Sequence, residues 1–275
     1  MENKVLDLDG LFDEYIKDYV YKNVGKVKPE EIENEISKLY VKFGDEKLKE
    51  LGGKTPNQFY AELTAEENVN LLLSHVETST PVSDFLLESL MKSDSEGALI
   101  KALNESENEE FLCYLINLLN DKNSSIAFNR YLEFVLYDYP ENLRELATES
   151  LYPFADKVAT RIIEEFSNLK EDKKECVLDI LSHAKEKKDQ IFDILISSFV
   201  KYPKKTALYA GFLARYGDER ALTFLYGKIE EEKISYADFE ELRFAIESLG
   251  GEYNKEKDFS NDKFYKIIKG QNLKK

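Results

Sequence analysis

The chain has 275 residues, of which 43% are hydrophobic, so it can bury a sizeable core as one elongated domain or two compact ones. Charged residues make up 33% of the chain and the formal net charge is −16. This acidic balance argues against nucleic acid and against an anionic membrane surface as partners, because both attract clustered lysines and arginines. A basic or cationic partner is favoured electrostatically.

The first residues, MENKVLDLDGLFDEY, lack the basic start and the apolar segment of a secretory signal peptide. The longest uncharged apolar run, FLCYLINLLN at 111–120, is far shorter than the roughly 20 residues that span a bilayer. Cys113 and Cys176 lie on apolar helical patterns without a CxxC motif, which indicates free buried thiols in a reducing compartment. We therefore expect a cytoplasmic protein.

Apolar residues recur at helical spacing almost everywhere in the chain. Steps of three, four and three residues place Phe239, Leu242, Ile246 and Leu249 on one face of a helix. No segment alternates with period two between turn residues, so we expect an all-α protein with essentially no sheet. In the first part of the chain the expected helices are 10–22, 29–43, 55–62, 65–76, 81–91 and 96–103.

Local signals support several of these helix starts. Thr64 with Glu67, and Ser106 with Glu109, have the spacing of capping boxes, in which a hydroxyl and a carboxylate satisfy free backbone N–H groups. Pro29 and Pro81 suit the first turn of a helix, where the missing N–H costs nothing. Residues 1–104 show no clear repeat and are expected to form an irregular helical module or cap.

From residue 155 onward the expected helices come in pairs. Their second members end in the similar stretches FLARYGDE and AIESLGGE, so Gly217 and Gly250, 33 residues apart, are equivalent. That separation is typical of stacked two-helix units. An earlier pair, 107–119 with 124–137, fits less closely, and an extra helix at 141–150 breaks the spacing. The expected pairs are 155–166 with 173–184, 187–200 with 205–216, and 219–231 with 236–249; a last helix is expected at 261–269.

The segment YAGFLARYGDERALTFLYGKI, residues 209–229, resembles without a gap the short bacterial HEAT-like repeat that also occurs in phycobilin lyases. FAIESLGGE, at 244–252, resembles the end of the next copy. The resemblance implies an α-α superhelix of stacked antiparallel helix pairs, which we place at 105–252, followed by a weakly basic C-terminal helix and tail at 253–275. It does not imply lyase activity, because none of that family's cysteine or chromophore chemistry can be placed here.

The turn within ARYGDERALTFL, residues 214–225, is expected to join two helices. Gly217 can end the first helix in a left-handed conformation, which is cheap only without a Cβ. Asp218 can cap the next helix near Ala221, and Arg220 can pair with an acid of the adjacent repeat or cover its surface. The first of these helices also carries small residues that would let a neighbouring helix approach closely: Ala207, Gly211 and Ala214.

No pattern in the chain indicates catalysis or metal binding. His75 is expected on a helix flank and His183 in a last helical turn, and neither has a second ligand at helical spacing. The stretch at 121–132 lacks the glycine and the final glutamate of a calcium loop, which indicates a helix–helix turn. GxxxxGK[ST], GxGxxG and GxSxG are absent. We therefore expect no enzyme activity, no metal and no cofactor.

In stacked helix pairs the second helices usually line the concave side, where partners bind. We therefore expect a non-enzymatic scaffold or adaptor that binds another protein there, with a basic partner surface favoured. Because Tyr and Arg dominate interface hot spots, the solvent-facing candidates are Tyr209, Arg215, Tyr216, Glu240, Arg243 and Glu247. The alternative interpretation is that the two tyrosines pack between repeats and the Arg–Glu pairs are ordinary salt bridges.

Two other functions stay open. One is a HEAT-like enzyme such as a DNA alkyl-base glycosylase, a family that reads DNA from a basic concave groove; the acidic charge of this chain disfavours it. The other is a regulatory module that binds a small ligand. Such a module predicts a closed apolar pocket between the two halves of the chain.

Overall fold

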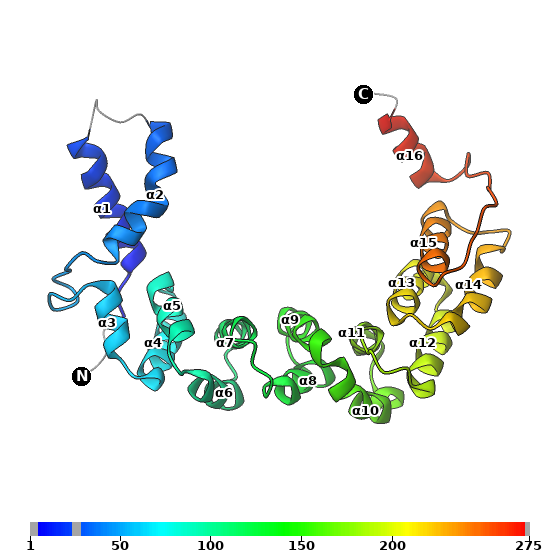
Figure 1. Cartoon of the computed structure of the whole chain (residues 1–275), viewed down its shortest axis with the longest axis horizontal. Coiled ribbons are helices and arrows are strands. Elements are labelled where there is room, and N and C mark those ends of the chain that lie inside the picture. Colours follow the sequence, from blue (N-terminus) through cyan, green and yellow to red (C-terminus); the bar gives the residue numbers. More distant parts are fainter. Residues whose placement is uncertain (1–4, 24–28, 273–275) are drawn as a thin grey trace. The chain divides into compact units, whose positions relative to one another are not determined.

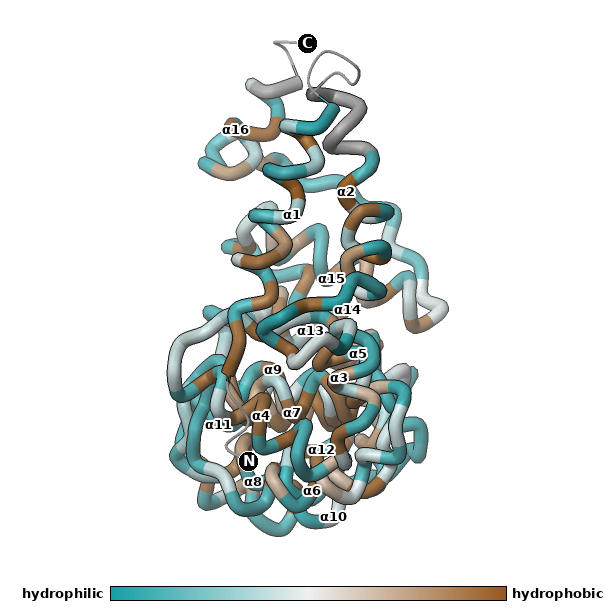
Figure 2. The backbone as a smooth tube through the Cα atoms, turned by 90° about the vertical axis from the view of Figure 1, so that its left-hand side faces the viewer, coloured by the Kyte–Doolittle hydropathy of each residue, from teal (hydrophilic) through white to brown (hydrophobic). Residues whose placement is uncertain are grey.

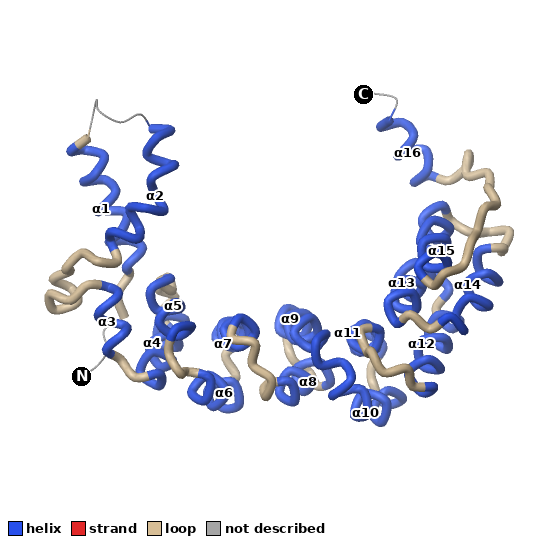
Figure 3. The backbone as a smooth tube through the Cα atoms, viewed as in Figure 1, coloured by secondary structure: helices blue, strands red, loops and turns tan. Residues whose placement is uncertain are grey.

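The computed structural model describes residues 5–23 and 29–272 (Figure 1). Residues 1–4 at the N-terminus and the last three residues of the expected tail lie outside the described residues. In the described part of the chain every regular element is a helix, and no strand is present (Figure 3). The expected all-α class is therefore confirmed.

Two compact units make up the chain, Met1–Arg130 and Tyr131–Lys275. This division reflects compactness alone. The domain limits expected at residues 104 and 252 depend on where the repeats begin and end, and they stay predictions.

The helices described in the first unit are α1 (Leu8–Lys22), α2 (Pro29–Phe43), α3 (Pro56–Glu62), α4 (Ala65–Glu77), α5 (Asp84–Lys92), α6 (Glu96–Glu105) and α7 (Glu109–Asp121), and the unit ends inside α8 (Phe128–Leu136). α4 packs on α5, α6 and α7, whereas α3 packs on α5 and α1 on α2. The helix expected at 107–119, which the sequence pairs with 124–137, is α7, and it packs on α6.

Polar side chains fix several helix starts in this unit. Thr64 and Glu67 form the expected capping box, with the Thr64 N–H donating to Glu67 Oε2 at 2.8 Å and the Glu67 N–H donating to Thr64 Oγ1 at 3.2 Å. A second capping box, which the sequence analysis missed, joins Thr55 and Gln58. α2 begins at Pro29, as expected for a proline in a first turn.

Two expected helix starts are wrong. Ser106 ends α6, and the residue that caps α7 is Asn108, whose side chain accepts a hydrogen bond from Phe111 N at 3.1 Å. Pro81 lies before α5 and not in its first turn, because Ser83 caps that helix. In both cases a good capping residue, Asn108 or Ser83, stands two positions further along the chain, and the helix begins after that residue.

Aromatic rings hold α1 and α2 against α5. Phe12 meets Tyr40 edge to face, with 4.9 Å between ring centroids, and Tyr40 stacks on Phe85 at 4.6 Å. Phe43 is 1% exposed and contacts both Phe12 and Phe85. Since each such ring buries a large apolar area, this cluster is the core that fixes the N-terminal helices.

The helices described in the second unit after α8 are α9 (Glu141–Leu151), α10 (Ala155–Glu165), α11 (Glu171–Ser182), α12 (Asp189–Lys201), α13 (Thr206–Tyr216), α14 (Leu222–Ile229), α15 (Tyr236–Ser248) and α16 (Lys263–Asn272). α9 packs on α11, α11 on α13, and α13 on α15, and we call these four helices layer A. Figure 1 shows α10, α12 and α14 on the other side of the unit, and we call these three layer B.

The three helix pairs expected after residue 155 are confirmed, because α10 packs on α11, α12 on α13 and α14 on α15. The helix at 141–150, expected to interrupt the series, is α9 and packs on α11 as a member of layer A. Hydrophobic residues recur along the helices with hydrophilic residues between them (Figure 2). In α11, for example, Val177, Ile180 and Leu181 are 0% exposed.

The chain after α15 covers one flank of that helix. Tyr253 and Phe259 are buried, and Phe259 lies 5.0 Å from the ring of Phe239 in α15. α16 follows and packs on α15, with Tyr265 edge to face against Tyr236 at 4.9 Å. Aromatic side chains from the C-terminal segment therefore pack against α15, the layer A helix of the last pair.

Candidate binding surface

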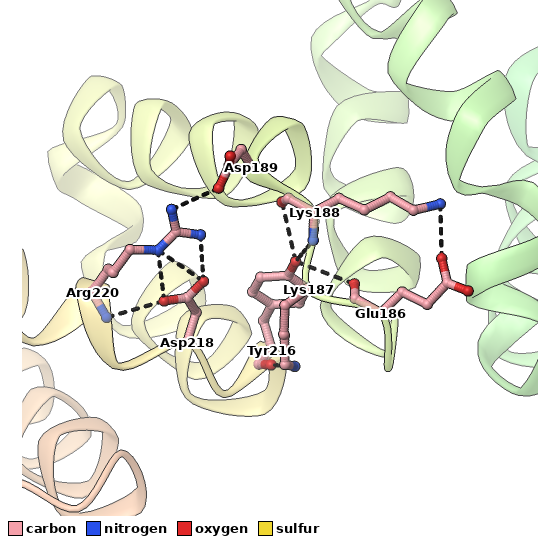
Figure 4. A network of polar contacts seen from close by, with 7 residues as sticks. All are labelled: Glu186, Lys187, Lys188, Asp189, Tyr216, Asp218 and Arg220. Carbon is pink, nitrogen blue, oxygen red and sulfur yellow. Dashed lines mark hydrogen bonds and ion pairs between the residues drawn. The ribbon is translucent and has the colours of Figure 1, made fainter.

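The turn between α13 and α14 is built as the sequence predicts. Gly217 ends α13 in the left-handed region, with φ +72° and ψ +38°. Asp218 Oδ1 accepts a hydrogen bond from Arg220 N at 3.1 Å, and the Arg220 guanidinium donates to Asp218 at 2.6 Å and to Asp189 in α12 at 2.7 Å (Figure 4). These charged side chains therefore join neighbouring helix pairs.

Two of the six partner-binding candidates do not face solvent, so that part of the prediction is wrong. Tyr216 is 0% exposed, and its hydroxyl accepts a hydrogen bond from Lys188 N at 2.8 Å (Figure 4). Tyr209 is 3% exposed, with ring centroids 5.8 Å from Phe212. Both tyrosines share a face of α13 with Leu213, and that face packs on the neighbouring helices.

The other four candidates lie at or near the surface of layer A. Arg215 donates to Asp179 of α11 and to Ser182 Oγ, the latter at 2.9 Å. Arg243 pairs with Glu240, three residues earlier in α15, at 2.6 Å. The remaining candidate, Glu247, is exposed. These ion pairs match the salt-bridge alternative, and binding of a partner by the four residues stays a prediction.

Layer A also carries a groove of about 310 Å³ between α9, α11 and α13, which we call the layer A groove. Leu208 of α13 supplies an apolar side chain that is 42% exposed. Carboxylates surround this apolar part on the α9 and α11 sides. The lining residues are Glu145, Thr148, Glu149, Tyr152, Glu175, Cys176, Asp179, Leu208 and Phe212.

No lysine or arginine lines the groove. Two of its four carboxylates are paired at the edge, Glu175 with Lys205 and Asp179 with Arg215. The other two, one helical turn apart on α9, are exposed and form no ion pair with any described residue: Glu145 and Glu149. The groove therefore keeps an excess of negative charge.

Beside the four carboxylates, the groove holds a tyrosine hydroxyl and a thiol that stay neutral near pH 7, and a histidine lies next to it. Burial raises the pKa of the Tyr152 hydroxyl, and so does its hydrogen bond to Asp179 Oδ2 at 2.8 Å. Burial also raises the pKa of the Cys176 thiol. His183 stacks on Tyr152 with 3.9 Å between centroids, and burial followed by the charge of Arg215 lowers the pKa of its imidazole.

These shifts bear on what the groove can do chemically. A thiol with a raised pKa is a poor nucleophile, because the thiolate is the reactive form. A neutral imidazole stacked on a tyrosine ring adds no positive charge. The groove therefore presents an apolar floor and carboxylate rims, an arrangement suited to contact with a cationic and apolar surface.

The sequence analysis missed the α9 side of the groove because it treated this helix as an interruption. A usable signal was present in the periodicity. Leu143, Ala147 and Leu151 are buried on one face of α9, and the opposite face carries Glu145 and Glu149. What the sequence could not supply was the packing of α9 on α11.

No protein-family model, curated protein or solved structure matches this chain. Among the described residues, no group of three or more His, Cys, Asp and Glu side chains is arranged to hold a metal ion. No helix in the described ranges has the length and apolar character needed to cross a membrane.

Proposed function

We propose that this protein is a non-enzymatic scaffold or adaptor that binds another protein through layer A. The observation that carries the proposal is the layer A groove, where Glu145 and Glu149 stand beside the exposed Leu208 without a cationic partner. Exposed carboxylates next to apolar surface favour a partner with basic and apolar side chains, since complementary charge speeds encounter and fixes register.

We also propose that helix pairs in the second unit are HEAT-like units of an α-solenoid. Two observations support this. Three successive pairs pack in chain order, and their second helices all lie in layer A. Gly217 and Gly250, equivalent in the repeat, both adopt a positive φ, +72° and +81°. In such a stack layer A corresponds to the concave, partner-binding side.

The location we propose is the cytoplasm. Cys113 and Cys176 are free and half-buried in the structure, which suits a reducing compartment. We further propose that the bound surface is protein and not nucleic acid, because the carboxylates of the groove repel phosphate groups.

Affinity capture from the native cell, read out by mass spectrometry, tests the proposal. We expect the variant Glu145→Lys/Glu149→Lys to lose partners that the wild-type chain captures. The matched control is Glu164→Lys/Asp193→Lys, which reverses two exposed acids on layer B without an ion pair among described residues. Equal capture by wild type and both variants would contradict a role for the groove.

Arg215→Ala and Arg243→Ala extend the test to the rest of layer A. Both side chains are partly exposed, at 43% and 41%. If either arginine is a contact residue, its truncation weakens capture further, because arginine at an interface is a frequent hot spot. Unchanged capture by both variants would restrict the partner surface to the groove.

A further inference from the structure

α16 is a basic element in an acidic chain. It carries Lys263, Lys266 and Lys269 and no acidic residue, whereas the whole chain has a net charge of −16. Phe264 and Ile267 of the same helix are 52% and 58% exposed. Residues three positions apart lie on the same side of a helix, so α16 has an uncovered face with both apolar and basic side chains.

The packing of α16 on α15 leaves that face partly exposed. The closest ring contacts to the rest of the unit are made by Tyr265, which meets Tyr236 at 4.9 Å and Phe259 at 6.3 Å. Phe264 also lies 6.5 Å from Tyr236 but stays 52% exposed. Lys263 and Lys266 are exposed and form no ion pair with a described residue. The helix is thus held by one side and offers the other.

The layer A groove has the complementary features. Glu145 and Glu149 are spaced by one turn, about 6 Å, and Lys263 and Lys266 on α16 are also about one turn apart. Two ion pairs can therefore form together. Beside the two acids, the exposed Leu208 offers apolar surface to an incoming apolar side chain.

We propose that α16 of one copy docks into the layer A groove of a second copy of this chain. The mode is that of an amphipathic helix laid into a groove, with apolar anchors one turn apart. The lysines and the exposed apolar side chains of α16 match the carboxylates and the apolar surface of the groove. The inference uses the groove of the proposed function but does not depend on a foreign partner.

Docking of this kind joins different surfaces of the two copies. Each copy offers one helix and one groove, so two copies can exchange helices in a closed dimer, or the contact can continue into larger rings or open chains. Because exposed ion pairs supply much of the attraction, the association weakens as salt rises.

Sedimentation velocity on the full chain tests this. We expect the weight-average sedimentation coefficient of the wild type to rise with protein concentration at low salt. At high salt we expect it to fall. The variants Glu145→Lys/Glu149→Lys and Lys263→Glu/Lys266→Glu should each stay monomeric alone. The layer B control Glu164→Lys/Asp193→Lys should associate as the wild type does.

Mixing the two monomeric variants gives the decisive result. In the mixture the original helix of the groove variant can enter the original groove of the helix variant. The reversed helix of the helix variant can likewise enter the reversed groove of the groove variant, so complexes form again. Misfolded variants could not produce this recovery. A monomeric wild type at low salt, or a mixture without complexes, would overturn the proposal, and so would binding of a monomeric chain to phosphatidylserine vesicles through α16.

The outcomes separate this inference from the proposed function. A monomeric wild type whose captured partners are lost with Glu145→Lys/Glu149→Lys would overturn self-docking and leave the scaffold function standing. Self-association that the same variant abolishes, with capture of foreign partners unchanged, would support self-docking and contradict partner binding through the groove.

Discussion

The Tyr216 hydroxyl at the end of α13 accepts a hydrogen bond from the backbone N–H of Lys188 at the start of α12, at 2.8 Å. The ring is 0% exposed, and the Lys187 ammonium donates to the Tyr216 carbonyl oxygen. One side chain thus satisfies a backbone donor of a neighbouring helix and fills the space between them. This bond explains why a residue chosen as a partner contact is instead structural.

Replacement of Tyr216 by Phe should lower the free energy of unfolding by about 1 kcal/mol, because the partly buried Lys188 N–H loses its acceptor. The matched control is Tyr131→Phe. Tyr131 is 1% exposed, and its hydroxyl has no hydrogen-bond partner among the described residues. Its removal should be neutral or stabilising in urea unfolding. Equal losses in the two variants would contradict a specific role for the Tyr216 hydroxyl.

Two glycines in and after α13 should respond to alanine with opposite signs. Gly217→Ala places a side chain at φ +72°, which costs about 1 kcal/mol for an L-residue. Gly211 lies within the helix, and an added Cβ there meets nothing within 4 Å. Gly211→Ala should therefore gain about 0.5–1 kcal/mol. Melting temperatures of the two variants test both predictions. A lower melting temperature for Gly211→Ala would show that the site is crowded.

The same comparison bears on one position of the small-residue stripe. Ala207, Gly211 and Ala214 are half-buried, and an added Cβ at Gly211 would meet no heavy atom within 4 Å. At Ala207, by contrast, the backbone N–H donates to Asp238 Oδ1 of α15 at 3.1 Å. The sequence pattern is compatible with either a packed or an exposed stripe, because both need only small side chains at helical spacing. Packing of α11 and α15 decides which side of α13 is covered.

The features that the sequence predicts correctly are those set by residues close together in the chain. They are the turn at Gly217 and Asp218, the three helix pairs and the capping box at Thr64. Prediction failed where distant packing decides, as for Tyr216, which is polar enough for the surface yet buried. His75 is another case: it was expected on a helix flank but is 0% exposed, and its Nδ1 lies 2.8 Å from the Pro81 carbonyl oxygen.

Acidic pH should weaken the ion pair between Asp218 and Arg220. The Arg220 guanidinium holds the pKa of the Asp218 carboxyl below its ordinary value. A folded-state pKa below the unfolded value of about 3.9 stabilises the fold fully above that pH, and the contribution disappears as pH falls through the folded-state pKa.

The variant Asp218→Asn isolates this effect, because the amide oxygen can still accept from Arg220 N. We expect it to be less stable than wild type at pH 7 and to converge with wild type as the pH falls through the lowered pKa of Asp218. Asp189→Asn is the control, since that carboxylate is 84% exposed and pairs with the same guanidinium. A constant difference between wild type and Asp218→Asn across the pH range would contradict the ion-pair explanation.

Two lysines that share one carboxylate should differ in their contribution to stability. Lys173 is only 6% exposed, and its ammonium donates to Asp138 Oδ1 at 2.7 Å and to the Leu136 carbonyl oxygen at the end of α8 at 3.2 Å. Lys170 contacts the same aspartate at 3.1 Å but is 67% exposed. Lys173→Ala should lose about 1–3 kcal/mol in urea unfolding, because a helix-terminal carbonyl loses its donor and a buried stem is removed.

Lys170→Ala should stay within about 0.5 kcal/mol of wild type, as exposed ion pairs usually do. The variant Lys173→Met separates the two contributions of the buried lysine, because methionine fills the space of the stem without donating a hydrogen bond. If the hydrogen bond from Lys173 to the Leu136 carbonyl oxygen contributes most of the stability, Lys173→Met will be nearly as unstable as Lys173→Ala. If Lys173→Met matches wild type, packing of the stem alone accounts for the buried lysine, and the bond to Leu136 contributes nothing measurable.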